Sequence, residues 1–136
     1  MQSNKTINFR IHHCRRDLND SATTIKIHLV DNRFDDLRKA IANAENIFSL
    51  SATKYPPLQE FNMPPNYFDG NWNSVDSSLV SLDSKTALLK VKESIEKACR
   101  RSNRFLAGQE FSEQRQSLEN IVDIIDSLQQ RQMSQV

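Results

Sequence analysis

The sequence of 136 residues predicts a single α+β domain, and three observations predict it. Apolar and polar residues alternate near the N-terminus, which is typical of strands. Apolar residues recur with a helical period later in the chain. All four prolines lie between these parts as two Pro-Pro pairs, which neither a helix nor a central strand accommodates. The expected order is a β-hairpin with a covering helix (1–50), an irregular Pro/aromatic acidic segment (54–84) and an antiparallel helical hairpin (85–133).

The antiparallel β-hairpin is predicted from two runs with a period of two. A polar stretch, residues 15–22, separates the runs and has the length of a long hairpin loop. Pairing Ile11 with Ile25 places the apolar members of both runs on one face of the sheet. These members are Ile7, Phe9, Ile11, Ile25, Ile27 and Leu29.

A helix over about residues 32–50 is expected to cover this hairpin. Asp31 or Asn32 is a suitable N-cap, because a short polar side chain accepts a hydrogen bond from a free N–H of the first turn. A continuous apolar stripe follows at helical spacing, and its members are Phe34, Leu37, Ile41, Ala44 and Phe48.

Two further helices form the predicted helical hairpin. The first begins with Asp83 or Ser84 as its cap, and its apolar stripe extends from Leu88 to Phe105. At Gly108 the stripe shifts by one residue, about 100° around a helix, which predicts a break there with Gly108 as a left-handed C′ residue. The sequence suggests no internal repeat of architectural length.

Charge on this hairpin suggests a nucleic-acid-binding surface as the alternative function. Residues 85–106 contain seven bases and two acids, whereas residues 107–136 contain two bases and five acids. A basic stripe is the electrostatic footprint of phosphate binding. The acids of the last helix offer a structural interpretation, in which the two helices attract each other. The basic stripe consists of Lys90, Lys97, Arg101 and Arg104.

The Pro/aromatic segment is the predicted partner-binding site. It holds five of the ten aromatic residues, and aromatic side chains are enriched at protein interfaces. We therefore predict a non-enzymatic protein–protein interaction module, such as an adaptor, chaperone, inhibitor or immunity-type protein. The residues expected to contact the partner are Tyr55, Glu60, Phe61, Tyr67, Phe68, Asp69 and Trp72. Val122 and Ile124 widen the last apolar stripe, which suggests a homo-oligomer through the C-terminal helices.

The sequence favours neither an enzyme nor a metal protein, and no cofactor is expected. On the predicted strands His12, Cys14 and His28 would approach one another, but they lack the close ligand spacing of zinc sites. No nucleophile is paired with a base. With no secretory signal and no apolar run of about 20 residues, the expected location is the cytoplasm, with both cysteines reduced.

Overall fold

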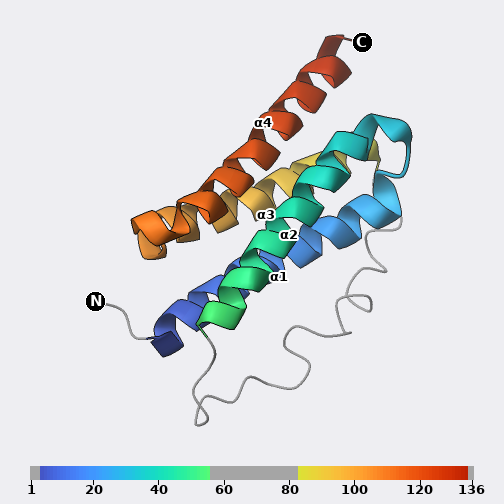
Figure 1. The fold of residues 1–136 in the computed structure, drawn as a ribbon. Coiled ribbons are helices and arrows are strands. Elements are labelled where there is room, and N and C mark those ends of the chain that lie inside the picture. Colours follow the sequence, from blue (N-terminus) through green and yellow to red (C-terminus); the bar gives the residue numbers. More distant parts are fainter. Residues whose placement is uncertain (1–3, 56–82, 135–136) are drawn as a thin grey trace.

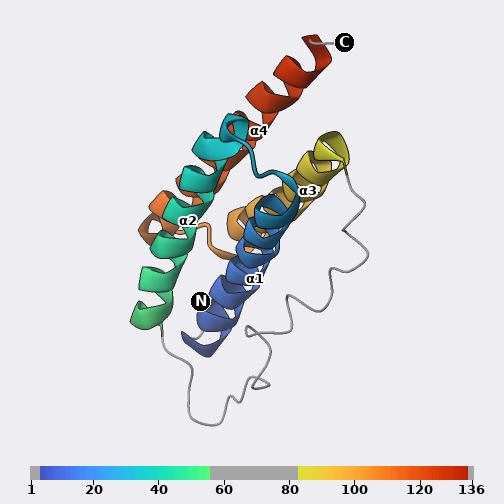
Figure 2. The ribbon, with the colours of Figure 1, turned by 90° about the vertical axis from the view of Figure 1, so that its right-hand side faces the viewer.

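The computed structural model describes residues 4–55 and 83–134, which form an antiparallel four-helix bundle (Figure 1). α1 lies beside α2 and α3, and α4 contacts the same two helices (Figure 2). Neighbouring helices run in opposite directions, since Arg10 of α1 contacts Phe105 of α3 whereas Asp17 contacts Arg101. The elements are α1 (Asn4–His28), η1 (Asn32–Phe34), α2 (Asp35–Lys54), α3 (Ser84–Phe105), η3 (Gln109–Phe111) and α4 (Ser112–Ser134).

The predicted α+β class and its N-terminal β-hairpin are wrong, because both alternating runs lie in the single helix α1, apart from Leu29, which directly follows it. From Ile11 to Ile25, buried residues recur every three or four positions, through Cys14, Leu18 and Ser21. This helical stripe passes through the stretch that the prediction treated as a loop. Ile27, a member of the alternating pattern, is 43% exposed. Isoleucine and threonine favour strands only weakly, and burial of α1 against both α2 and α3 outweighs that preference.

The helix predicted over residues 32–50 is confirmed as η1 followed by α2. Asp31 is its N-cap, and its carboxylate accepts a hydrogen bond from the backbone N–H of Arg33 at 3.0 Å. The apolar stripe of this segment is buried as expected.

The predicted helical hairpin is also confirmed, as α3 and α4. The carboxylate of Asp83 caps α3 by accepting a hydrogen bond from the Thr86 N–H at 2.7 Å. The break at Gly108 is correct, but its predicted left-handed conformation is wrong. Gly108 has φ −65° and ψ 159°, an extended conformation open to any residue, and it is the N-cap of η3.

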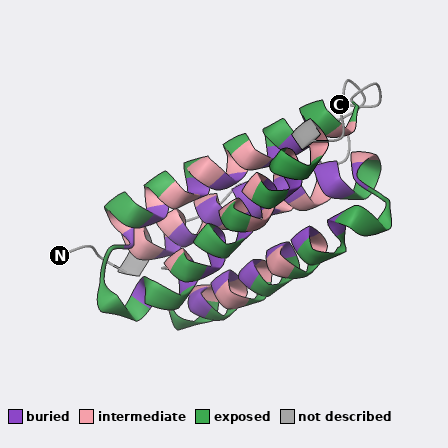
Figure 3. Cartoon of the chain, turned by 90° about the horizontal axis from the view of Figure 1, so that it is seen from above, coloured by how far each residue is buried: buried purple, intermediate pink, exposed green. Residues whose placement is uncertain are grey.

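One hydrophobic core is shared by all four helices, each of which turns one buried stripe inward (Figure 3). Phe34 and Phe48 of the first hairpin and Ile95 and Ile121 of the second belong to it. The opposite sides of the helices are polar, and no helix within the described ranges is long and apolar enough to span a membrane. Val122 and Ile124 are partly buried and pack against this same core.

The two hairpins are structural copies of one unit. Each residue of the first hairpin corresponds to the residue 77 positions later in the second, as Phe34 does to Phe111, without an insertion or deletion. Of the fifteen buried residues in 6–55, twelve have a buried counterpart in the second copy. In the first copy these are Ile11, Cys14, Leu18, Ser21, Ile25, Leu29, Phe34, Leu37, Ile41, Ala44, Phe48 and Ser51. In the second they are Leu88, Val91, Ile95, Ala98, Ser102, Leu106, Phe111, Gln114, Leu118, Ile121, Ile125 and Leu128.

The turn of each hairpin is held by an arginine at equivalent positions. Arg38 donates to the backbone carbonyls of Leu29 at 2.6 Å and Asp31 at 2.9 Å. Arg115 donates to the carbonyls of Leu106 at 2.5 Å and Gly108 at 2.8 Å. The expectation that the chain lacks a repeat is therefore wrong. The copies share the short pattern Leu-x4-Phe-x3-Arg at their turns but few other identical residues, so the repeat is carried mainly by burial and geometry.

The link between the hairpins joins opposite ends of the bundle. α2 ends beside the start of α1, where the side-chain amide of Asn8 donates to the carbonyl of Tyr55. α3 is antiparallel to α1 and therefore starts at the other end (Figure 2). The predicted Pro/aromatic segment, residues 54–84, lies outside the described residues except for its two ends.

Candidate functional site

Charge is divided unequally between the two pairs of helices. α1 and α3 lie side by side and together carry twelve Lys or Arg residues against four Asp or Glu residues. α2 and α4 together carry five Lys or Arg residues against seven Asp or Glu residues. We call the outward surface of α1 and α3 the basic face.

The predicted basic residues form one line on α3, which we call the α3 stripe: Lys90, Lys97, Arg101 and Arg104. α3 buries the side from Leu88 to Ser102 in the core, so the stripe lies on the outer side, toward α1. Lys90, Lys97 and Arg104 are exposed and Arg101 is half-buried. At a rise of about 1.5 Å per residue, the stripe is about 21 Å long.

Arg101 connects the stripe to α1 by an ion pair with the carboxylate of Asp17. The Asp17 side chain is only 6% exposed. Burial raises its pKa, whereas the positive charges of Arg101, Arg16 and Lys97 act in the opposite direction. Asp17 thereby holds the guanidinium of Arg101 at the seam between the two helices.

Residues of α1 that the sequence prediction missed add to the basic face. Burial, together with repulsion from Arg101, Arg16 and Arg10, lowers the pKa of His13 to about 4, so its imidazole lies among these cations as a polar group that is neutral near pH 7. Arg10 stacks on the Phe105 ring, with its guanidinium carbon 3.6 Å from the ring centre. These residues were missed because the prediction placed this part of α1 in a strand, which would separate them from α3.

Mutual attraction between α3 and α4 does not account for the stripe. The salt bridge between these helices joins Lys92 to Asp126 at 3.3 Å, and Lys92 is not a stripe residue. Within the described ranges, neither Lys90 nor Lys97 makes an ion pair. Attraction between the opposite charges of these two helices, which the sequence suggested, therefore explains Lys92 but not the α3 stripe.

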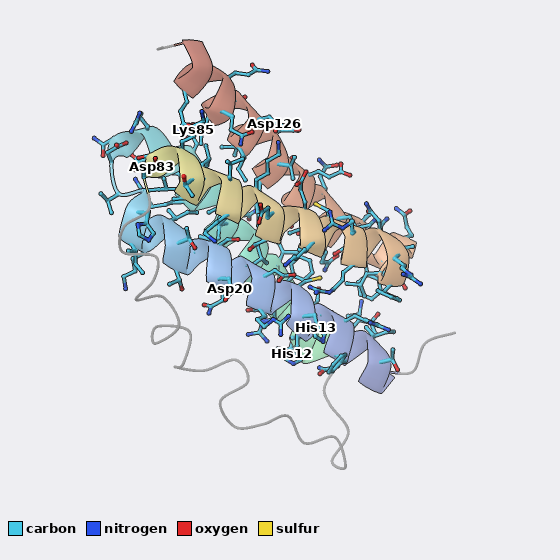
Figure 4. The ribbon with its side chains drawn as sticks, turned by 180° about the vertical axis from the view of Figure 1, so that it is seen from behind. His12, His13, Asp20, Asp83, Lys85 and Asp126 are labelled. Carbon is cyan, nitrogen blue, oxygen red and sulfur yellow. The ribbon has the colours of Figure 1, made fainter. Side chains whose placement is uncertain are left out.

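The first hairpin provides an internal comparison for the α3 stripe. α1 has the same inward stripe and the same place in the bundle as α3, yet none of its equivalent positions is lysine or arginine. Figure 4 labels two of them, His13 and Asp20, on α1. The first hairpin therefore occupies its place in the bundle without lysine or arginine at these positions. The equivalents of Lys90, Lys97, Arg101 and Arg104 are His13, Asp20, Thr24 and Ile27.

Of the predicted partner-binding residues, the described ranges include only Tyr55. Its ring is half-buried and lies 5.5 Å from that of Phe111, centre to centre. It borders a groove of about 260 Å³ between the end of α2 and the start of α4, near Leu50, which is 63% exposed. The residues outside the described ranges are Glu60, Phe61, Tyr67, Phe68, Asp69 and Trp72.

The considered metal ligands do not converge. His12 and Cys14 are two residues apart on a helix and so point about 200° apart, and His28 lies about four turns further along α1. Cys14 is fully buried, and its sulfur lies 3.4 Å from the hydroxyl of Ser102. Among the described residues no group of three or more His, Cys, Asp or Glu side chains is placed to hold a metal ion.

A hollow of about 390 Å³ between α3 and α4 contains the second thiol, Cys99, beside Glu96, Arg100 and Glu119. Burial, together with the negative charges of the two glutamates, raises the pKa of Cys99 to about 11. The thiol is therefore protonated at neutral pH, the form with little nucleophilic reactivity.

Among the predicted sites, the α3 stripe is thus the one that the described residues present as a continuous exposed surface. Its side chains come from one helix, and Asp17 of the neighbouring helix fixes one of them. No known protein family, curated protein or solved structure matches this chain.

Proposed function

We propose that this protein is a non-enzymatic binding module whose α3 stripe binds the phosphate backbone of a nucleic acid. The observation that supports it most is the internal comparison, since α1 fills the equivalent place in the bundle with no lysine or arginine at those positions. Lys90, Lys97 and Arg104 are exposed cations at positions where the first hairpin has none, and their grouping along one side of α3 matches the requirement of a polyanion. We place the protein in the cytoplasm.

The composition of the surface favours phosphate over a protein partner at this site. Protein interfaces are depleted in lysine and depend on aromatic or large apolar anchors. The stripe contains two exposed lysines, and the large hydrophobic residues that are exposed on the described parts of α1 and α3 are Ile27 and Leu89, one on each helix. Phosphate contacts need charge without such anchors.

The expected contact is small and independent of base sequence. Four cations along about 21 Å can neutralise about four phosphates, so the logarithm of the association constant should fall with the logarithm of salt concentration with a slope of about −3 to −4. Binding of this kind holds the backbone and reads no bases.

The test is fluorescence anisotropy of labelled single-stranded and duplex oligonucleotides with the full chain, over about 50 to 200 mM salt. The stripe variant is Lys90→Gln/Lys97→Gln/Arg104→Gln. The matched control, Lys39→Gln/Lys54→Gln/Arg131→Gln, removes the same charge from exposed positions of α2 and α4.

We expect the stripe variant to weaken binding at least about tenfold at 50 mM salt and to reduce the salt slope by about 3, with little effect of the control. Equal losses in both variants would mean that net charge, not the stripe, attracts the nucleic acid. Affinity weaker than millimolar for the unmodified chain, or equal competition by polyglutamate, would contradict the proposal.

A protein partner at the Tyr55 groove is the second candidate, and it continues the main prediction from the sequence. The supporting observation is the exposure of Leu50 beside this groove. Glu110 and Glu113 line the same groove with one cation, Lys54, and this excess of acids suits a partner carrying basic residues.

A pulldown from nuclease-treated extract tests this second candidate. The expected result is a captured protein that is lost with Leu50→Glu and retained with the stripe variant. Capture that survives Leu50→Glu, or that disappears with nuclease, would count against the groove.

A further inference from the structure

We propose that a second copy of this chain can replace either hairpin of the bundle, so that two chains exchange hairpins and form a dimer. The inference depends on the repeat and not on the proposed nucleic-acid binding. Its consequence for function is that one particle would carry two α3 stripes.

The first step is the symmetry of the interface. α1 packs antiparallel to its equivalent α3, and α2 packs antiparallel to its equivalent α4. Two copies of one unit that face each other in this way have the arrangement of an isologous dimer joined into one chain. The inward surfaces of the two hairpins therefore have buried residues at the same twelve equivalent positions.

The second step concerns what exchange would disrupt. Contacts within a hairpin, including the two arginines that hold the turns, are local and would remain. The main contacts between the hairpins are those of α1 with α3 and of α2 with α4, and the same contacts re-form when the second hairpin comes from another chain. The link that joins opposite ends of the bundle would then pass from one bundle to the other.

The third step identifies a contact that reports exchange. Among the salt bridges between described residues, Asp17–Arg101 is the one that joins the two hairpins. Reversing one partner places like charges together across α1 and α3. In an exchanged heterodimer of Asp17→Arg and Arg101→Asp chains, one bundle has the natural pair and the other has the reversed pair, so neither holds a mismatch.

The experiment refolds the two full-length variants separately and together, and measures molar mass by light scattering and melting by circular dichroism. Each variant alone should melt well below the unmodified protein. The mixture should give a one-to-one species at about twice the chain mass of 15.7 kDa, which melts above both single variants. Asp17→Arg/Arg101→Asp in one chain is the control, and it should remain a monomer.

Unmodified chains with two different tags, refolded together at about 1 mM, provide a second measurement. This concentration is comparable with the effective concentration of joined segments, so the two tags should co-purify in a dimer. Variants that are unfolded alone but fold on mixing would also support exchange. A mixture that contains only 15.7 kDa species or unfolded chains, together with no co-purification of tags, would overturn the proposal.

Discussion

Replacing Arg38 or Arg115 with methionine tests whether the two hairpin turns are equivalent. Each arginine donates to two backbone carbonyls of its turn, one half-buried and one exposed. Methionine keeps most of the aliphatic stem but removes the guanidinium. The half-buried carbonyl of Leu29 or Leu106 then loses a charged donor.

The expected cost of each substitution is about 2 kcal/mol. A hydrogen bond to a charged group contributes about 1.5 kcal/mol when partly buried, and we assign about 0.5 kcal/mol to the exposed one. Arg38 also pairs with Asp35, but that pair lies at the surface, where ion pairs contribute little. The two turns lie at opposite ends of the bundle, so the double substitution should cost the sum, about 4 kcal/mol.

Urea denaturation followed by circular dichroism measures these changes, and the melting temperature should fall by about 6–10 °C for each single variant. Lysine at either position is the control for charge, because it keeps the positive charge but not the planar fork of donors. If Arg38→Met lowered the free energy of unfolding strongly and Arg115→Met did not, the two turns would not be equivalent. A double variant far from additive would refute their independence.

Three further predictions concern titration, backbone and thiols. The pKa of both His12 and His13 is lowered from 6.5 to about 4, mainly by burial. As the pH falls, these two histidines therefore become protonated in the unfolded chain before they do in the folded protein. Stability should therefore decrease from pH 6.5 to about 4, and His12→Gln/His13→Gln should flatten this dependence in urea titrations. Gly108→Ala should be neutral or stabilising by about 0.5 kcal/mol in the same assay, because the φ of Gly108 is −65° and the three atoms nearest to the added Cβ belong to the carboxylate end of exposed Glu110, which can turn away. A loss of stability above about 1 kcal/mol would contradict this. A thiol reagent should modify half-buried Cys99 slowly and fully buried Cys14 only on unfolding, and equal rates by mass spectrometry would disprove that order.

Local signals were sufficient where a helix carries its own start and a regular stripe. Each cap was predicted to within two adjacent residues, and the structure shows that Asp31 and Asp83 are the ones that accept the expected backbone hydrogen bond. The line of Lys90, Lys97 and Arg104 followed from helical spacing alone, and the structure places these residues on one exposed side of α3. Caps and stripes depend on residues within a few turns, so one stretch of sequence contains all the information they need.

The first 29 residues show where such reasoning fails. The inward stripe of α1 contains Ser21, and buried Asn8 and Thr24 lie beside it, so its helical period is interrupted by polar side chains. The alternation of Ile25 and Ile27 suggested a strand instead. These polar residues are buried because α2 and α3 enclose α1, a condition that no local pattern expresses.

The sequence by itself determined the caps, the helical stripes from residue 32 onward and the grouping of cations on α3, because each depends on spacing along one helix. Tertiary structure decided that α1 is a helix, that the two hairpins are equivalent units and that Arg101 pairs with Asp17 on another helix. The physical reason is that packing depends on which surfaces meet. Two hairpins with few identical residues can bury equivalent positions, since a core requires apolar volume at those positions and not particular side chains.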